Sequence, residues 1–243
     1  MLRSVFLLQL EYALEAIDRS TVKKLLSRPR TCLPISPCPG GWSALFWSIG
    51  QKRGDSKDRE LLVYYVAKIV SQIRTSAGLS PSHVNERDND GQTPMHWAAA
   101  LNKPGVCRVL YRLGGRLDVL DSDGNTPLAW AISSSDPEVG TGKEQLVDNS
   151  DSIEQIVTLN PSAVNFSPKE GRLRNWTALH QAVYEGRKAY LEILLPHATL
   201  ATMRRVEKDA VKDDVTIGAR DFKRLIAQTS EKARVRYEAP RGC

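Results

Sequence analysis

The sequence predicts an all-α protein in which repeated helix pairs stack into one solenoid, followed by non-repeat C-terminal helices. The segment from Asp88 to Ala99 returns in shortened form from Asp121 to Ala131. Thr93 and Thr126, which occupy the same place in the two copies, are 33 residues apart (126 − 93). A fixed period close to this value is typical of stacked helical repeats. Each copy also has the residues that begin a helix, a threonine followed by a proline.

The two copies share the pattern D-x-x-G-x-T-P-L-H-x-A-A, with some substitutions, and this pattern resembles the ankyrin repeat. The resemblance implies a β-turn followed by two antiparallel helices in each unit. It covers about residues 42–195, is strongest in the two middle repeats, and is absent after Pro196. The expected architecture is therefore an ankyrin-type solenoid of four repeats at residues 31–196.

Flanking segments complete the expected organisation. Residues 1–30 are predicted to form an N-terminal capping helix pair, and residues 197–243 a C-terminal helical cap with a basic tail. The first capping helix has apolar residues near helical spacing at Val5, Leu8, Tyr12, Leu14 and Ile17. A second short helix is expected at residues 21–27, where Pro29 ends it. A terminal cap of this kind has one apolar face, because its other side meets water.

The first repeat, at residues 42–49, is a weaker copy of the motif. Ser43 stands at the position of the cap threonine and Phe46 at that of the motif histidine. A polar, charged insertion follows at residues 51–59, and a long apolar helix is expected at residues 60–75.

The second repeat is the most regular copy. Thr93 is expected to cap a helix that has Pro94 at its first position, where the missing N–H group costs nothing. Gly91 allows a positive backbone angle in the preceding turn. The second helix is expected at residues 105–113 and ends at the two glycines that follow.

The third and fourth repeats are separated by an insertion. Thr126 and Thr177 are 51 residues apart (177 − 126), and the polar stretch at residues 133–150 absorbs the excess. This stretch is expected to be a mobile loop, with a helix resuming at residues 152–159. Asn175 replaces the turn glycine of the fourth repeat, since asparagine tolerates the left-handed region. Two C-terminal helices are expected at residues 199–212 and 218–233.

Composition indicates a soluble protein, cytoplasmic and/or nuclear, without a membrane span. The net charge is +6, and residues 204–243 hold +4 of it (11 basic minus 7 acidic residues). No run of eighteen apolar residues exists. The four cysteines are too scattered for a disulfide framework or a zinc site, so reduced thiols are expected. Gly140-Thr141-Gly142-Lys143 departs from the phosphate-loop pattern, and no cofactor is expected.

In ankyrin-type stacks, the turn tips and first helices line a concave groove that binds partners. The matching positions in this sequence form the candidate partner-binding set. Its members are Trp42, Trp47, Asn89, Asp90, Gln92, Trp97, Ser122, Asp123, Asn125, Trp130, Arg174, Trp176 and Tyr184.

Trp47, Trp97 and Trp130 each follow the position of the motif histidine by one residue. Each indole could fill space between adjacent repeats. Together they could also form an aromatic ladder for a partner, since tryptophan is enriched among interface hot spots. His96 and His180 are assigned a structural role by the resemblance. Phe46 and Ala129 replace that histidine, so less regular turns are expected in the first and third repeats.

The function expected from this pattern is non-enzymatic protein binding, as an adaptor, inhibitor or targeting subunit that acts as a monomer. No histidine stands at a suggestive distance from a cysteine or aspartate partner, so no catalytic or metal-binding residues are expected. Two alternatives stay open. The basic C-terminal section could bind nucleic acid or an acidic membrane, although acidic residues interleave it. The chain could also regulate an enzyme in trans.

Overall fold

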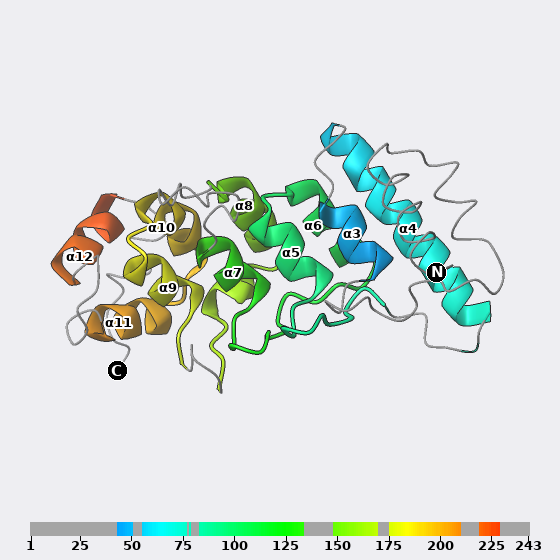
Figure 1. Ribbon diagram of the computed structural model, residues 1–243. Coiled ribbons are helices and arrows are strands. Elements are labelled where there is room, and N and C mark those ends of the chain that lie inside the picture. The colour runs from blue at the N-terminus through cyan, green and yellow to red at the C-terminus, as the bar shows by residue number, and fades with distance from the viewer. Residues whose placement is uncertain are drawn as a thin grey trace, which may run out of the picture. The chain divides into compact units, whose positions relative to one another are not determined.

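The computed structural model describes residues 43–50, 55–76, 78, 83–133, 148–169, 175–209 and 219–228. In these ranges every regular element is a helix (Figure 1), which confirms the predicted all-α class. The chain divides into two compact units, Met1–Arg116 and Leu117–Cys243. The predicted capping pair at residues 1–30 lies outside the described residues.

The first unit contains two helix pairs around one apolar core. Helix α3 spans Ala44–Gly50, α4 Ser56–Ser76, α5 Pro94–Ala100 and α6 Pro104–Arg112. Helix α3 packs on α4 and α5, and α6 packs on the same two helices. The side chains that fill the core are fully buried; they include Leu45, Phe46, Ile49, Leu62, Val66, Met95, Ala98, Ala99, Val106 and Leu110.

Helix α4 is 21 residues long and begins earlier than the sequence predicts. The predicted insertion at residues 51–59 therefore overlaps the helix, since residues 56–59 form its first turn. Asp55 explains the early start: its Oδ1 atom accepts the backbone N–H of Asp58 at 2.7 Å. An aspartate that satisfies a free N–H at a helix start stabilises that helix. The polar composition of this turn hid it from a hydrophobicity pattern.

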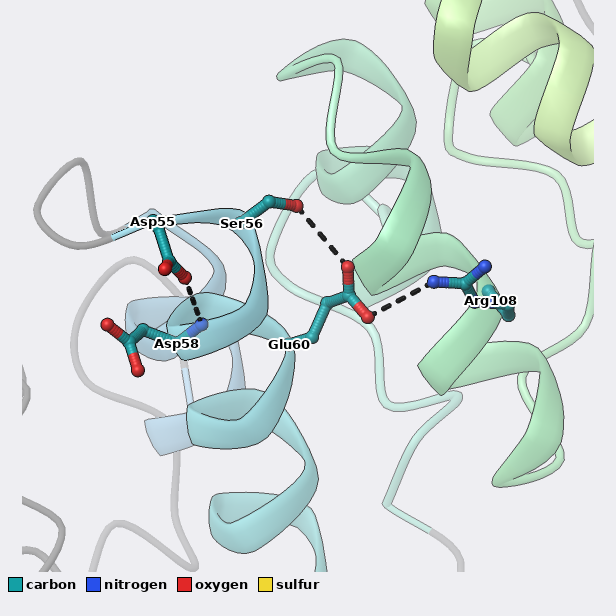
Figure 2. Close-up of polar contacts among 5 residues, drawn as sticks. All are labelled: Asp55, Ser56, Asp58, Glu60 and Arg108. Atoms are coloured by element: carbon teal, nitrogen blue, oxygen red, sulfur yellow. Dashed lines mark hydrogen bonds and ion pairs between the residues drawn. The ribbon is translucent and has the colours of Figure 1, made fainter.

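A carboxylate joins α4 to the start of α6. Glu60 Oε1 accepts the hydroxyl of Ser56 at 3.3 Å, and Glu60 Oε2 pairs with Arg108 Nη2 at 3.2 Å (Figure 2). The same carboxylate lies over Gly105, where a Cβ atom would be 1.8 Å from Glu60 Oε1. Negative charge beside the first turn of a helix is favourable, because the backbone N–H groups there carry partial positive charge.

The ends of α5 and α6 use one closing geometry. After α5, Lys103 N–H donates to the carbonyl of Ala98 at 3.0 Å, and Asn102 has a positive φ of 46°. After α6, Gly115 N–H donates to the carbonyl of Leu110 at 2.8 Å, and Gly114 has a φ of 91°. In both cases a left-handed residue turns the chain so that two orphan carbonyls are satisfied.

The second unit contains the third and fourth repeats and the C-terminal helices. Helix α7 spans Pro127–Ser133, α8 Ser150–Leu159, α9 Ala178–Tyr184, α10 Lys188–Leu194, α11 Leu200–Asp209 and α12 Ala219–Gln228. Short 3-10 helices lie at Pro161–Asn165 and Leu195–His197. Helix α7 packs on α8 and α9, while α10 packs on α8 and α9. Helix α11 packs on α9, and α12 packs on α10 and α11.

The insertion between α7 and α8 is framed by a buried asparagine. Residues 134–147, including the segment Gly140-Thr141-Gly142-Lys143, lie outside the described residues. Asn149 at the start of α8 is 0% exposed, and its Nδ2 atom donates to the carbonyl of Ala131 at 2.9 Å. Its backbone N–H donates to the hydroxyl of Tyr190 at 2.9 Å. One residue thereby holds α7, α8 and α10 together.

Gly115 is a position where the close packing of unit one can be tested. A Cβ atom there would lie 2.8 Å from the backbone carbonyl oxygen of Leu110, which cannot move without opening the end of α6. Gly115→Ala should therefore lower the free energy of unfolding by about 1–3 kcal/mol, measured by urea denaturation. Gly50→Ala is the control, since its Cβ would meet no atom within 4 Å. Equal stabilities of the two variants would contradict this account.

Candidate partner-binding surface

The turn before α5 is organised by the carboxylate of Asp88. Its Oδ1 atom accepts the backbone N–H groups of Asp90 at 3.1 Å and Gln92 at 2.8 Å. The N–H of Gly91 donates to the Asp88 carbonyl at 3.1 Å, and the φ of this glycine is 73°. Asp88 is only 7% exposed, so its hydrogen bonds are largely shielded from water. The turn is thus held by one buried acid.

The second oxygen of this carboxylate binds the first helix of the same repeat. Trp97 Nε1 donates to Asp88 Oδ2 at 3.1 Å. The ring of Trp97 also meets Phe46 of α3 edge-to-face, with centroids 6.0 Å apart and planes at 84°. Edge-to-face pairs are favourable because the positive edge of one ring faces the negative face of the other. Trp97 therefore joins its turn to its helix and its helix to the preceding repeat.

The third repeat has the same turn. Asp121 Oδ1 accepts the backbone N–H groups of Asp123 at 3.0 Å and Asn125 at 2.7 Å, and Trp130 Nε1 donates to Asp121 Oδ2 at 2.7 Å. The φ of Gly124 is 87°. The expectation that Ala129 would leave this turn less regular is therefore wrong. The aspartate, and not the motif histidine, shapes the turn.

The two motif histidines act inside their own helix caps. His96 Nδ1 accepts the backbone N–H of Thr93 at 3.0 Å and lies 2.9 Å from Thr93 Oγ1. His180 Nδ1 makes the same contacts with Thr177, at 3.1 and 2.8 Å. Each threonine hydroxyl also completes a capping box with the first turn of its helix. In the third repeat the Ala129 N–H donates to Thr126 Oγ1 at 3.1 Å, so its cap forms without a histidine.

The predicted tips are the exposed part of each turn. Asn89, Asp90, Ser122 and Asp123 are exposed, and Gln92 and Asn125 are partly buried. Asn125 also adds its side-chain amide to the Asp121 carboxylate, at 3.0 and 3.2 Å. Backbone groups and acids beneath the surface fix the turns, so the outward side chains are free to differ between repeats.

The predicted tryptophans are neither fully buried nor fully exposed. Trp47, Trp97 and Trp130 are of intermediate exposure. The indole N–H groups of Trp97 and Trp130 donate to the aspartate of their own repeat. This supports a structural role for these two tryptophans. Trp42 and Arg174 lie outside the described residues.

The fourth repeat replaces this arrangement by an aromatic cluster. Trp176 stacks on the ring of His180 (centroids 6.2 Å apart, planes at 23°) and contacts Tyr184 (5.3 Å, 59°). Tyr184 is 47% exposed, the largest exposed fraction among the exposed large hydrophobic side chains of the described part. Gln181 occupies the position of the tryptophan, and its Nε2 atom donates to Ser133 Oγ of α7 at 3.1 Å. The sequence motif predicts two members of this cluster, but not their stacking on the histidine.

The repeat motif alone does not predict that Asp88 and Asp121 organise the surface turns. The sequence does hold a signal for them. In the second and third repeats, an aspartate (Asp88 or Asp121) stands five residues before the cap threonine, and a tryptophan stands four residues after it. The first repeat has Trp47 but a cysteine, Cys38, at the aspartate position, and the fourth has Gln181 and Arg172 at the two positions. The aspartate occurs only in repeats that also have the tryptophan, and this pattern indicates that the two residues pair.

Within the described ranges, no group of three or more His, Cys, Asp or Glu side chains is placed to hold a metal ion. None of the helices described combines the length and hydropathy that crossing a bilayer needs. On α12, Phe222 and Ile226 are buried, while Lys223 Nζ pairs with Glu207 Oε1 of α11 at 2.6 Å. Part of the basic charge of this section is thus neutralised by a neighbouring acid.

Comparison with known protein families matches residues 65–141 to the family described as ankyrin repeats (3 copies). A comparison with curated proteins finds no match to the chain. The matched segment contains both aspartate-organised turns, at residues 88–92 and 121–125. The fourth repeat lies beyond the match, but its threonine–histidine cap has the same geometry as that of the second repeat.

Removal of the Asp121 carboxylate should weaken the third repeat. Asp121→Ala leaves two backbone N–H groups and one indole N–H without their acceptor. We expect the free energy of unfolding to fall by about 2–4 kcal/mol. Trp130→Phe removes only the indole bond and should cost about 1 kcal/mol, both measured by urea denaturation. The control Ser122→Ala changes an exposed tip residue and should stay within about 0.5 kcal/mol of the parent. A cost for Asp121→Ala no larger than that of the control would contradict the role of the turn acid.

The environment of His180 disfavours its charged form. Burial lowers its pKa from 6.5 to about 4, the positive charge of Arg205 acts in the same direction, and Asp209 opposes both. The hydrogen bonds agree with a neutral ring: Nδ1 accepts from Thr177, while Nε2 lies 3.3 Å from Asp209 Oδ2 and can donate. A proton on Nδ1 would face the N–H of Thr177.

This shift makes stability depend on pH in a defined window. Below pH 6.5 the unfolded chain takes up a proton at this residue, whereas the folded chain does so only near pH 4. The stabilisation is therefore complete above pH 6.5 and is lost as the pH falls towards 4, at up to about 1.4 kcal/mol per pH unit. His180→Asn keeps an acceptor for Thr177 but does not titrate. Urea denaturation at pH 7 and 4.5 should show a smaller acid loss for this variant; equal losses would contradict the assignment.

Proposed function

Because residues 65–141 are ankyrin repeats, and such repeats are generally protein–protein interaction modules, we propose that this chain is a non-enzymatic protein-binding protein. It would act as an adaptor, inhibitor or targeting subunit, as a monomer, in the cytoplasm and/or nucleus. The partner would contact the turn tips and the exposed edges of the first helices. No cofactor enters this proposal.

The observation that supports it most directly is the combination of rigid turns with exposed, variable tips. In two successive repeats a buried carboxylate fixes the backbone through two N–H groups and an indole, while the tip side chains point to solvent. A surface that is already ordered loses little conformational entropy when a partner binds. This arrangement favours binding by exposed side chains without a change of the backbone.

The chemistry of the tips indicates what a partner would offer. The second repeat exposes Asn89 and Asp90, and the third exposes Ser122 and Asp123. Hydrogen-bond donors and basic side chains of a partner would complement these groups. In the fourth repeat, Tyr184 and the partly buried Trp176 offer an aromatic contact area, and aromatic residues dominate many interface hot spots. We therefore propose a partner segment with both basic and apolar residues.

The test uses affinity capture with the full chain, followed by a titration of the purified partner. Asp90→Lys combined with Asp123→Lys reverses both exposed tip charges but keeps Asp88 and Asp121, so the turns stay intact. We expect the dissociation constant for the partner to rise by at least about tenfold, since like charges would then face each other. Tyr184→Ala should weaken binding separately, through lost apolar contact.

The matched control reverses two charges elsewhere: Lys223→Glu with Arg224→Glu, both exposed on α12. This variant should bind the protein partner as the parent does. If it alone loses binding, and the captured molecule is nucleic acid or an acidic vesicle, the basic C-terminal section is the binding site and the proposal is wrong. The proposal also fails if the tip variant and Tyr184→Ala both bind the partner as tightly as the parent.

A further inference from the structure

Helix α4 carries an exposed apolar stripe opposite its buried face. After Ser56, the first residue of the helix, its exposed residues recur at spacings of three and four, which places them on one side of a helix. They are Lys57, Leu61, Tyr64, Tyr65, Lys68, Gln72 and Thr75. Leu61, Tyr64 and Tyr65 are 41%, 40% and 45% exposed, and form three of the five exposed large hydrophobics in the described part.

The opposite face of α4 is already occupied. Leu62, Val63 and Val66 are fully buried, and α4 packs on α3 and α6. On the exposed side, Tyr64 and Tyr65 contact each other edge-to-face at 5.9 Å, and Lys68 Nζ lies 5.7 Å from the Tyr64 ring centroid. These contacts hold the rings in place. The stripe is therefore an ordered aromatic surface between two lysines, Lys57 and Lys68.

The sequence before Ser43 contains a segment that complements this stripe. If residues 5–17 are helical, as their apolar spacing predicts, Val5, Leu8 and Tyr12 lie on one side. Phe6, Leu10, Leu14 and Ile17 lie on the other side, so the helix would be apolar on two faces and not on the single face expected of a terminal cap. A helix with two apolar faces is buried on both sides. The predicted neighbouring helix at residues 21–27 can cover only one of them.

Charge and chain length favour the same pairing. Between Val5 and Asp18 there are three acidic residues, Glu11, Glu15 and Asp18, and no lysine or arginine. Glu11 and Glu15 would flank the side that holds Leu8 and Tyr12, as lysines flank the stripe on α4. Residues 18–42 connect the segment to Ser43, at the start of α3, which packs on α4. A linker of this length can span any part of α4, which is about 30 Å long.

We propose that residues 5–17 dock as a helix on the exposed stripe of α4, with Leu8 and Tyr12 against Leu61, Tyr64 and Tyr65, and with Glu11 and Glu15 near Lys57 and Lys68. The tether favours this segment over a second copy of the chain, because linked segments meet at an effective concentration of about millimolar. This docking does not involve the turn tips.

Hydrogen–deuterium exchange of the full chain tests the docking. In the parent, amides of residues 5–17 should be protected. Tyr65→Glu places a carboxylate in the stripe, and should lower their protection by at least about tenfold while α5 and α6 are unchanged. The control Tyr111→Glu changes another exposed tyrosine, on α6, and should leave residues 5–17 protected. Lys68→Glu, which would repel Glu11 and Glu15, should also lower the protection of residues 5–17. This second variant replaces Tyr65→Glu as the test if Tyr65→Glu also lowers the protection of α5 and α6.

Two kinds of result would overturn the proposal. The first is exchange of residues 5–17 at the unprotected rate in the parent, and the second is unchanged protection of these residues when Tyr65 and Lys68 are changed. Either shows that they do not dock on the stripe. Light scattering tests whether a second copy of the chain covers the stripe instead. A parent that is a dimer and becomes a monomer with Tyr65→Glu assigns the stripe to a second copy.

Discussion

The second and third repeats depend on one kind of interaction: a nearly buried aspartate that accepts hydrogen bonds from its own turn and from the helix that follows. Asp88 and Asp121 each use one oxygen for two backbone N–H groups and the other for an indole N–H. Hydrogen bonds to an ionised acceptor are stronger than neutral ones, and a poorly hydrated site strengthens them further. The direction of the turn relative to the first helix is thereby set inside each repeat.

This arrangement separates the residues that shape the surface from those that could recognise a partner. The acid, the glycine and the cap threonine are buried or conformationally required, whereas Asn89 and Ser122 at equivalent tip positions differ and are exposed. The tryptophans belong partly to both groups. The indole N–H groups of Trp97 and Trp130 are engaged within their repeats, but both side chains are of intermediate exposure. Replacing such a tryptophan would change the turn as well as the surface, so tip substitutions report on binding more cleanly.

Much of the fold follows from the sequence because its determinants are local. A threonine cap followed by a proline begins α5, and left-handed residues end it and α6, all within a few positions of each other. Asn175 has the positive φ, 66°, that its place in the fourth motif predicts. The sequence pattern predicts the start of α4 too late, because Asp55 and the polar first turn carry no apolar signal. The bridge from His180 to Asp209 joins segments that no periodicity relates, so spacing alone could not predict it.

The fourth repeat shows what replaces the aspartate when it is missing. Here Gln181 stands at the position of the tryptophan, and no aspartate stands at the turn position. The Gln181 amide instead donates to Ser133 of the preceding repeat and to Glu185, which follows its own helix. His180 takes on a second bond, to Asp209 of α11, so this repeat is fixed by neighbours on both sides. The second and third turns are set by their own residues, while the fourth relies on α7 and α11. A change in either neighbour can therefore move the aromatic pair of Trp176 and Tyr184. For that reason, the fourth repeat is where binding and stability should be most closely linked.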